Sequence, residues 1–170
     1  MNASAKPQGR PKVRPLIIGI GNPLRSDDRL GWAVAETLEL IGHKRYDVRT
    51  VHQLTPELAQ PMAEANLVVM IDASHEGEPG EIRVNPVTPS AQPSAVGSHS
   101  TTPEELAALT AGIYGHCPPV VVVTMTGVDF SIGEWLSPII EGRVGLVCEA
   151  VRLVCAEKQR LEPPDSKLTQ

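Results

Sequence analysis

The stretch LIIGIGNPLRSDDRLG, residues 16–31, joins an apolar run to a glycine-containing turn and then to the start of a helical pattern. An uninterrupted apolar run such as Leu16–Ile20 is typical of a strand that is buried on both faces of a parallel sheet. From Leu30 to Ile41 apolar residues recur at helical spacing, and Gly42 follows as a stop signal. Strand, turn and helix in this order predict the first half of a βαβ unit.

Short apolar runs and helical patterns continue to alternate along the chain, which predicts an α/β fold around one sheet. We expect further strands at residues 47–52, 67–71, 80–84 and 120–124, with 80–84 at an edge of the sheet. Helices are expected to begin at Thr55-Pro56, at the capping box Thr102-Pro103-Glu104-Glu105 and at Ser137-Pro138. Pro61 predicts that the first of these three helices is short or kinked.

A chain of 170 residues fits a single domain, and the sequence predicts one folded domain over residues 15–157. Residues 1–14 hold four basic residues, no acid and no apolar run, and are expected to form a flexible basic tail. Residues 158–170 are polar with paired prolines and are expected to form a flexible C-terminal tail. The Pro-, Ser- and Ala-rich stretch 85–98 predicts a long loop, a type that is often functional.

Composition and charge exclude several classes of function. The net charge is −5, and without the basic residues of 1–14 the rest of the chain carries −9, which does not suit a surface that binds phosphate backbones. Two Trp, two Tyr and one Phe are too few for a platform that stacks nucleic-acid bases. No segment has the roughly 18 apolar residues of a membrane span. Three unpaired cysteines argue against a disulfide framework, so we expect a cytoplasmic protein.

Polar side chains follow the predicted strands at three places. Asp27 and Asp28 lie in the loop after the first strand, Asp72 ends the third, and His99 lies in the long loop before the capping box. Ligands of open α/β sheets bind beyond the carboxyl ends of the strands, so we expect these groups to converge. Two carboxylates and an imidazole from separate loops suit a divalent metal with positions left open for water or substrate.

Each of these residues also has a structural interpretation. Asp27 or Asp28 could cap the helix that begins near Leu30, because acids favour that end of a helix. His99, taken alone, is an ordinary surface histidine. Asp72 is harder to explain in this way, since a carboxylate at a buried strand end needs a partner, and this favours a functional role for it.

Two other chemistries fit the sequence poorly. Gly19 and Gly21 begin like a dinucleotide fingerprint, but Leu24 stands where the third glycine belongs, so these glycines are expected to form a tight turn that positions Asn22 and Asp28. Covalent catalysis by cysteine is a weak hypothesis. His116 and Cys117 are adjacent in a loop, and adjacent loop residues rarely face each other. Cys148 and Cys155 share a helical stripe with valines, so we expect both in the core.

Taken together, these motifs resemble the [NiFe]-hydrogenase maturation endopeptidases, in the branch that serves cytoplasmic, bidirectional-type hydrogenases. The resemblance covers roughly residues 15–157 and lies in the order and spacing of four motifs: Gly19-Ile20-Gly21-Asn22, Ser26-Asp27-Asp28-Arg29-Leu30-Gly31, Ile71-Asp72-Ala73 and Gly97-Ser98-His99. It implies a three-layer α/β/α sandwich with a twisted, mostly parallel five-stranded sheet.

The resemblance also implies an activity and a site. Members of the family remove a C-terminal extension from the hydrogenase large-subunit precursor after nickel insertion. Carried over to this sequence, Asp28, Asp72 and His99 are the catalytic and metal-contacting residues. The enzyme itself holds no permanent cofactor, because the nickel belongs to the precursor. Its partner is that precursor, with no nucleic acid and no membrane, and a monomer is usual for the family.

The sequence departs from the family pattern at two places. Arg29 stands where a glycine usually follows the acid pair, and His52-Gln53 replaces the Asp-Gly pair that many members have after the second strand. Two rival functions stay open at this point. Peptidyl-tRNA hydrolases share the Gly21-Asn22-Pro23 start, but the histidine motif that follows it there is missing here. A non-catalytic module that binds metal or a peptide tail would use the same acids without turnover.

Overall fold

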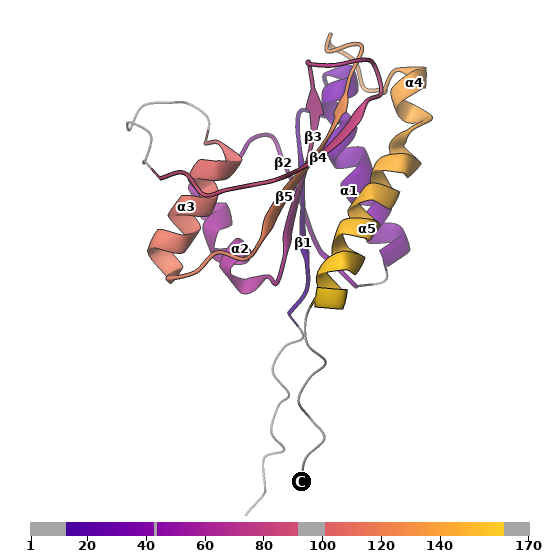
Figure 1. Ribbon diagram of the computed structural model, residues 1–170. Helices are drawn as coiled ribbons and strands as arrows, with labels where there is room; N and C mark the ends of the chain where they lie inside the picture. The colour runs from indigo at the N-terminus through magenta and orange to yellow at the C-terminus, as the bar shows by residue number, and fades with distance from the viewer. Residues whose placement is uncertain (1–12, 43, 92–100, 162–170) are drawn as a thin grey trace, which may run out of the picture.

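The computed structural model of the chain describes residues 13–42, 44–91 and 101–161 (Figure 1). The strands are β1 (Leu16–Ile20), β2 (Asp47–Val51), β3 (Val68–Ser74), β4 (Ile82–Pro86) and β5 (Val120–Thr126). The helices are α1 (Leu30–Gly42), α2 (Ala59–Glu64), α3 (Pro103–Tyr114), α4 (Pro138–Glu141) and α5 (Val144–Leu161). Two 3-10 turns, η1 (Ser26–Arg29) and η2 (Pro56–Leu58), precede α1 and α2.

The five strands form one sheet in the order β2-β1-β3-β5-β4. The first four run parallel, and β4 pairs antiparallel with β5 at one edge. The chain passes from β1 to β2 on one side of β1 and then returns to place β3 on its other side. The strand order therefore reverses between β1 and β3, and such a reversal opens a crevice at the carboxyl ends of the two strands.

Helices cover both faces of the sheet, as Figure 1 shows, so the predicted α/β fold with a mostly parallel five-stranded sheet is confirmed. Alternate residues of each central strand serve opposite layers. Ile17 and Ile71 pack with α1 and α5 in one core, while Ile18 and Met70 pack with α2 and α3 in the other. Because both faces are buried, β1 is apolar throughout.

Local signals in the sequence account for most element boundaries. The capping box of α3 is present, with Thr102 Oγ1 accepting from Glu105 N and the Glu105 carboxylate accepting from Thr102 N. α2 is only six residues long, as Pro61 predicts. Thr55 precedes η2 without the side-chain capping bond expected of it.

Two further boundaries differ from the prediction. β3 extends to Ser74, so Asp72 lies within the strand. α5 continues to Leu161, past residue 157, and Lys158 and Arg160 in its last turn favour that helix end electrostatically. None of the helices in the described ranges combines the length and the hydropathy that a membrane crossing requires.

Candidate active site

The turn after β1 brings the chain back against the strand ends through close backbone contacts. Gly21 has φ +130°, and a Cβ there would collide with the backbone oxygen of Asp28. A Cβ on Gly31, in the first turn of α1, would collide with the carbonyl oxygens of Ile20 and Ile71. In dinucleotide-binding folds the third glycine of the fingerprint lets the helix approach the strand closely. Here Leu24 occupies that position, and Gly31 allows the close approach instead. The expectation that this turn positions Asp28 is confirmed.

Asp28 lies in η1, which packs against β3 at the reversal point of the sheet. Its Oδ2 accepts a hydrogen bond from the backbone N–H of Asn22 at 3.0 Å, so the turn holds the carboxylate in place. Arg29, the departure from the family glycine, ends this 3-10 turn and is not among the described non-glycine residues with positive φ. The position therefore does not require glycine.

Asp72 is the half-buried acid of β3, and its Oδ1 accepts from the backbone N–H of Ala73 at 2.8 Å. Burial raises the pKa of Asp72, the Ala73 N–H lowers it, and the negative charge of Asp28 raises it again, to about 6. Because η1 packs against β3, the two carboxylates lie within range of electrostatic interaction. The structure thus brings together Asp28 and Asp72, as the strand order predicts.

Asp27, the neighbour of Asp28, has a different role. Its side chain is fully buried, and its carboxylate accepts hydrogen bonds from the backbone N–H groups of Val128, Asp129 and Ser137 at 2.7–2.9 Å and from the Ser137 hydroxyl at 2.8 Å. Burial acts to raise the pKa of Asp27, but these bonds outweigh it and the pKa lies below its ordinary value. Asp27 therefore neither caps a helix nor faces a ligand. It ties the loop after β1 to the loop after β5.

Residues 127–137, which we call the β5–α4 loop, also contact both strand ends that carry the acid pair. Ser26 N donates to Gly133 O at 2.8 Å, and Gly133 N donates to Leu24 O at 3.0 Å. On the other side, the ring of Phe130 stacks on that of His75, just after β3, with centroids 3.7 Å apart. The sequence did not reveal this loop as part of the site, because its contacts join residues about a hundred positions apart. His75 is exposed and stacks on Phe130.

His99 lies outside the described residues, and its predicted role stays a prediction. Within the described ranges, no three His, Cys, Asp or Glu side chains are grouped closely enough to hold a metal. His52, at the end of β2, is exposed and lies against the ring of Trp32 with centroids 5.4 Å apart. Among the described residues, the acids at the reversal point therefore form a pair without a third metal-binding side chain.

The cysteines are not arranged for nucleophilic catalysis. Cys148 and Cys155 are buried in the core, and burial raises the pKa of both thiols, that of Cys155 to about 11. Burial also raises the pKa of Cys117. The neighbouring His116 directs its ring nitrogens to the carbonyl oxygens of Ala63 and Tyr114. No thiol is thereby activated, and core packing of the α5 cysteines is confirmed.

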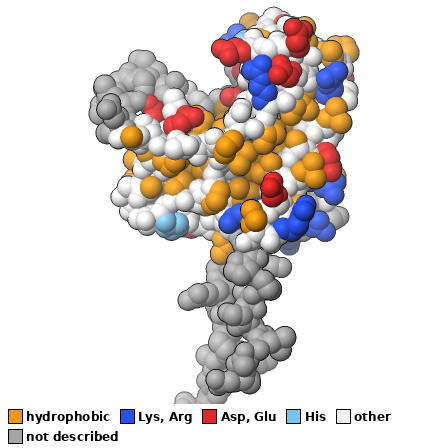
Figure 2. All heavy atoms as spheres, in the orientation of Figure 1, with side chains coloured by type: hydrophobic (Ala, Val, Ile, Leu, Met, Phe, Trp, Pro, Cys, Tyr) orange, Lys and Arg blue, Asp and Glu red, His pale blue; other side chains and the backbone are white. Residues whose placement is uncertain are grey.

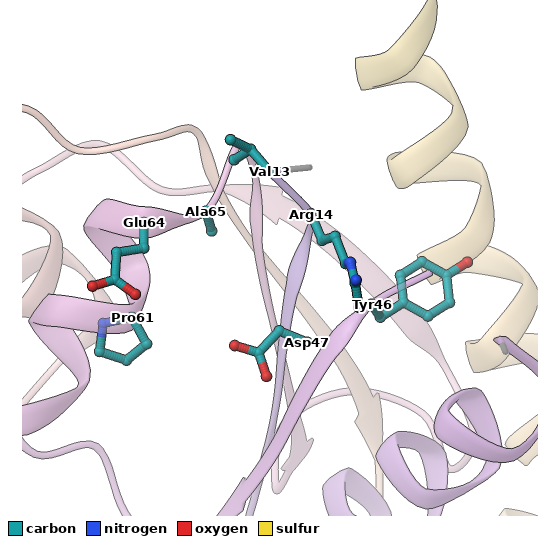
Figure 3. A pocket seen from close by; sticks show the side chains of 7 residues that line it. All are labelled: Val13, Arg14, Tyr46, Asp47, Pro61, Glu64 and Ala65. Atoms are coloured by element: carbon teal, nitrogen blue, oxygen red, sulfur yellow. The ribbon is translucent and has the colours of Figure 1, made fainter. Parts of the chain in front are cut away.

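A cavity of about 560 Å³ lies at the opposite end of the sheet (Figure 3). It is lined by residues that precede β1, begin β2 and end α2, namely Val13, Arg14, Tyr46, Asp47, Pro61, Glu64 and Ala65. Its volume would admit a small ligand, but ligands of open α/β sheets bind at the carboxyl ends of the strands. The acid pair therefore marks the candidate site, and this cavity does not.

Known structures share this fold. The [NiFe] hydrogenase maturation protease HycI of Thermococcus kodakarensis KOD1 matches with a TM-score of 0.66 and 26% identity over 85% of this chain and 93% of that one. The maturating endopeptidase HybD of E. coli matches with a TM-score of 0.63 and 21% identity over 85% and 93%. An endopeptidase from Escherichia coli matches with a TM-score of 0.65 and 22% identity over 91% and 99%.

No protein-family model and no curated protein matches the sequence. The structural likeness nevertheless extends over nearly the whole length of the matched proteases. The family motifs of residues 19–31 and 71–73 also lie on the two strand ends where the acid pair converges. In its fold and in these motifs the chain is similar to the [NiFe]-hydrogenase maturation proteases.

Proposed function

We propose that this protein is an endopeptidase that removes the C-terminal extension of a [NiFe]-hydrogenase large-subunit precursor after nickel insertion. The likeness to the HycI protease supports the reaction class. The observation that carries the proposal is the convergence of Asp28 and Asp72 at the reversal point between β1 and β3. Two carboxylates held together there are suited to recognise a metal centre that arrives with its substrate.

The nickel of the precursor would be contacted by Asp28, Asp72 and His99. A backbone N–H fixes one oxygen of each carboxylate, and no hydrogen bond from the described part of the chain reaches the other oxygen. The imidazole of His99 would complete a set of oxygen and nitrogen ligands that leaves positions open for the precursor's own groups. An unloaded precursor lacks the ion that these groups recognise, so it would not be cut.

The acid pair would then serve the hydrolysis itself. Nickel would polarise the scissile carbonyl or activate the attacking water. One of the two carboxylates would accept the proton of the water as the C–O bond forms and pass it to the amine that leaves when the peptide bond breaks.

We further propose that the enzyme works in the cytoplasm as a monomer, without a permanent cofactor, and belongs to the branch that serves bidirectional-type hydrogenases. Support for the branch comes from three short stretches of sequence. They are His52-Gln53-Leu54-Thr55-Pro56-Glu57-Leu58, Val128-Asp129-Phe130 and Leu136-Ser137-Pro138.

The proposal is tested by incubating the full chain with nickel-loaded and nickel-free large-subunit precursor and measuring the mass of the product. We expect loss of the C-terminal extension only from the loaded precursor. Asp47→Ala, which removes an exposed strand-borne carboxylate at the other end of the sheet, serves as the matched control and should cut like wild type. Binding of the loaded precursor without any mass change would favour a non-catalytic module instead.

A further inference from the structure

Four large apolar side chains are exposed beside the acid pair. Leu24 and Val128 are 57% and 55% exposed, and Ile132 and Trp135 are 93% and 80% exposed. Leu24 belongs to the loop that carries Asp28, and the other three belong to the β5–α4 loop. We call these four residues the apolar rim. Exposed apolar residues also occur on α1, α3 and α5. These four differ in their position, because they lie on two loops that hydrogen bonds join beside the acid pair, and this position makes them a candidate interaction surface.

The loops of the apolar rim are firmly held. Hydrogen bonds join Leu24 to Gly133 and Asp27 to Val128 across the two loops, and the Ser26 hydroxyl donates to the carbonyl of Ser131 at 3.1 Å. The buried carboxylate of Asp27 anchors this network. The exposure of Ile132 and Trp135 is therefore a property of ordered loops. An ordered apolar surface loses little conformational entropy on binding, and Trp is among the residues that dominate interface energies.

Both acids of the site are connected to the apolar rim. Leu24 lies four residues before Asp28 in the same loop. Phe130, within the β5–α4 loop, stacks on His75, three residues after Asp72. Figure 1 shows this loop above the sheet, at the end where α1 begins and β3 ends. A partner that presents a metal to the acid pair would therefore meet the apolar rim at the same time.

The surroundings of the apolar rim suit a protein partner. Arg25 and Arg29 donate to the carbonyls of Phe130 and Glu134 in the β5–α4 loop. Asp129 and Glu134 add acidic side chains to the same loops, and Figure 2 shows both signs of charge at this upper end of the molecule. Apolar residues with a mixed polar border are typical of protein interfaces. An anionic lipid surface would instead select a cluster of basic residues.

We infer that the apolar rim is the docking surface for the folded body of the large-subunit precursor, and that it seats an apolar patch next to the cleavage site. This inference rests on the proposed function. Contacts at the apolar rim lie outside the reacting atoms, so they strengthen binding of substrate and transition state equally. Their loss should therefore raise KM and leave kcat in place.

The test compares the full-length double variant Ile132→Ser/Trp135→Ser with wild type on nickel-loaded precursor. Leu40→Ser is the matched control, because Leu40 is 79% exposed on α1 but lies about 15 Å along the helix from Leu30, at 1.5 Å per residue. Trp135→Phe keeps an apolar ring at the rim. We expect Kd and KM to rise at least about 30-fold in the double variant, as for loss of an interface hot spot. The kcat and the melting temperature of the double variant should equal those of wild type. The Kd and KM of the two control variants, Leu40→Ser and Trp135→Phe, should also equal those of wild type.

The possible outcomes separate the docking surface from the activity. Cleavage by the double variant with unchanged Kd and KM overturns the docking surface and leaves the proposed function intact. If wild type binds the precursor without cutting it and the double variant loses binding, the docking surface stands and the protease proposal fails. If wild type neither binds nor cuts, both proposals fail.

Other occupants of the apolar rim give distinct results. A self-associating wild type and a monomeric double variant in sedimentation velocity would assign the surface to a second copy of the chain. The fluorescence of Trp135, measured as wild type minus Trp135→Phe, should be solvent-like in the free protein and shift to the blue when the precursor binds. Blue-shifted Trp135 emission in the free protein would show that another part of the chain covers the apolar rim. Either result overturns the inference.

Discussion

Ser137 donates two hydrogen bonds to Asp27, one from its backbone N–H at 2.7 Å and one from its hydroxyl at 2.8 Å, although the two residues lie 110 positions apart. These bonds join the loop that presents Asp28 to the β5–α4 loop. Because the Asp27 carboxylate is buried with four donors directed at it, its removal leaves several donors without a partner.

Asp27→Ala should therefore lower the free energy of unfolding by about 3–5 kcal/mol, because several buried N–H and O–H donors lose their acceptor at about 1–3 kcal/mol each. Ser137→Ala removes only the hydroxyl donor and should cost about 1 kcal/mol. Urea denaturation at neutral pH measures both. A destabilisation of Asp27→Ala no larger than that of Ser137→Ala would show that the loop connection depends on other contacts.

Asp72 should reduce the stability of the fold at neutral pH. Its pKa is raised from 3.8 in the unfolded chain to about 6, so the folded state favours the protonated form. Above pH 6 both states are ionised and the full penalty applies, up to about 3 kcal/mol for a shift of this size. Below pH 3.8 both are protonated and the penalty disappears.

Asp72→Asn mimics the protonated form and can still accept the bond from Ala73 N–H. Its free energy of unfolding should exceed that of wild type at pH 8, and the difference should vanish toward pH 4. Urea denaturation across this range measures the difference between the two proteins. A difference that stays constant with pH would show that Asp72 is not the group that titrates.

The proximity of the acid pair has its own test. The negative charge of Asp28 contributes to the raised pKa of Asp72, so Asp28→Asn should lower that pKa from about 6 toward its ordinary value. An NMR titration of the Asp72 side-chain carbon in wild type and in Asp28→Asn measures the change directly. An identical Asp72 pKa in the two proteins would mean that the carboxylates lie too far apart to hold one metal.

The close approach of α1 to the strand ends depends on Gly31. Gly31→Ala places a Cβ against the carbonyl oxygens of Ile20 and Ile71 and should destabilise the fold by about 1–3 kcal/mol or more. Gly112→Ala is the matched control, since no atom lies within 4 Å of a Cβ at that position in α3. It should stabilise the fold by about 0.5–1 kcal/mol through helix propensity. Thermal unfolding of both variants gives the comparison, and equal behaviour would refute the packing argument.

The sequence predicts those features that arise from local signals. The apolar run of β1 and the capping box of Thr102 and Glu105 involve neighbouring residues, and the structure confirms both. The convergence of Asp28 and Asp72 could also be predicted, because the reversal of strand order follows a general rule for open α/β sheets.

Contacts between distant segments explain what the sequence does not predict. Asp27 and Asp28 are adjacent and of the same residue type. Only the β5–α4 loop determines that the Asp27 carboxylate is the one that accepts its hydrogen bonds. Ser137 was expected to cap a helix, but no side-chain capping bond is present and its hydroxyl donates to Asp27. That pairing depends on a loop whose position only the assembled sheet defines. The role of His99 stays a prediction from the family resemblance.

We propose that Asp28 and Asp72 act as one unit on the nickel of the precursor. The most direct test measures the rate of cleavage of nickel-loaded precursor by Asp28→Ala, Asp72→Ala and the double variant, with folding checked by circular dichroism. We predict that each single variant loses at least about 10³-fold and that the double variant is no slower, since residues that act as a unit are strongly non-additive. Losses that multiply in the double variant, or a single variant that retains wild-type activity, would show that the two carboxylates do not act as one unit.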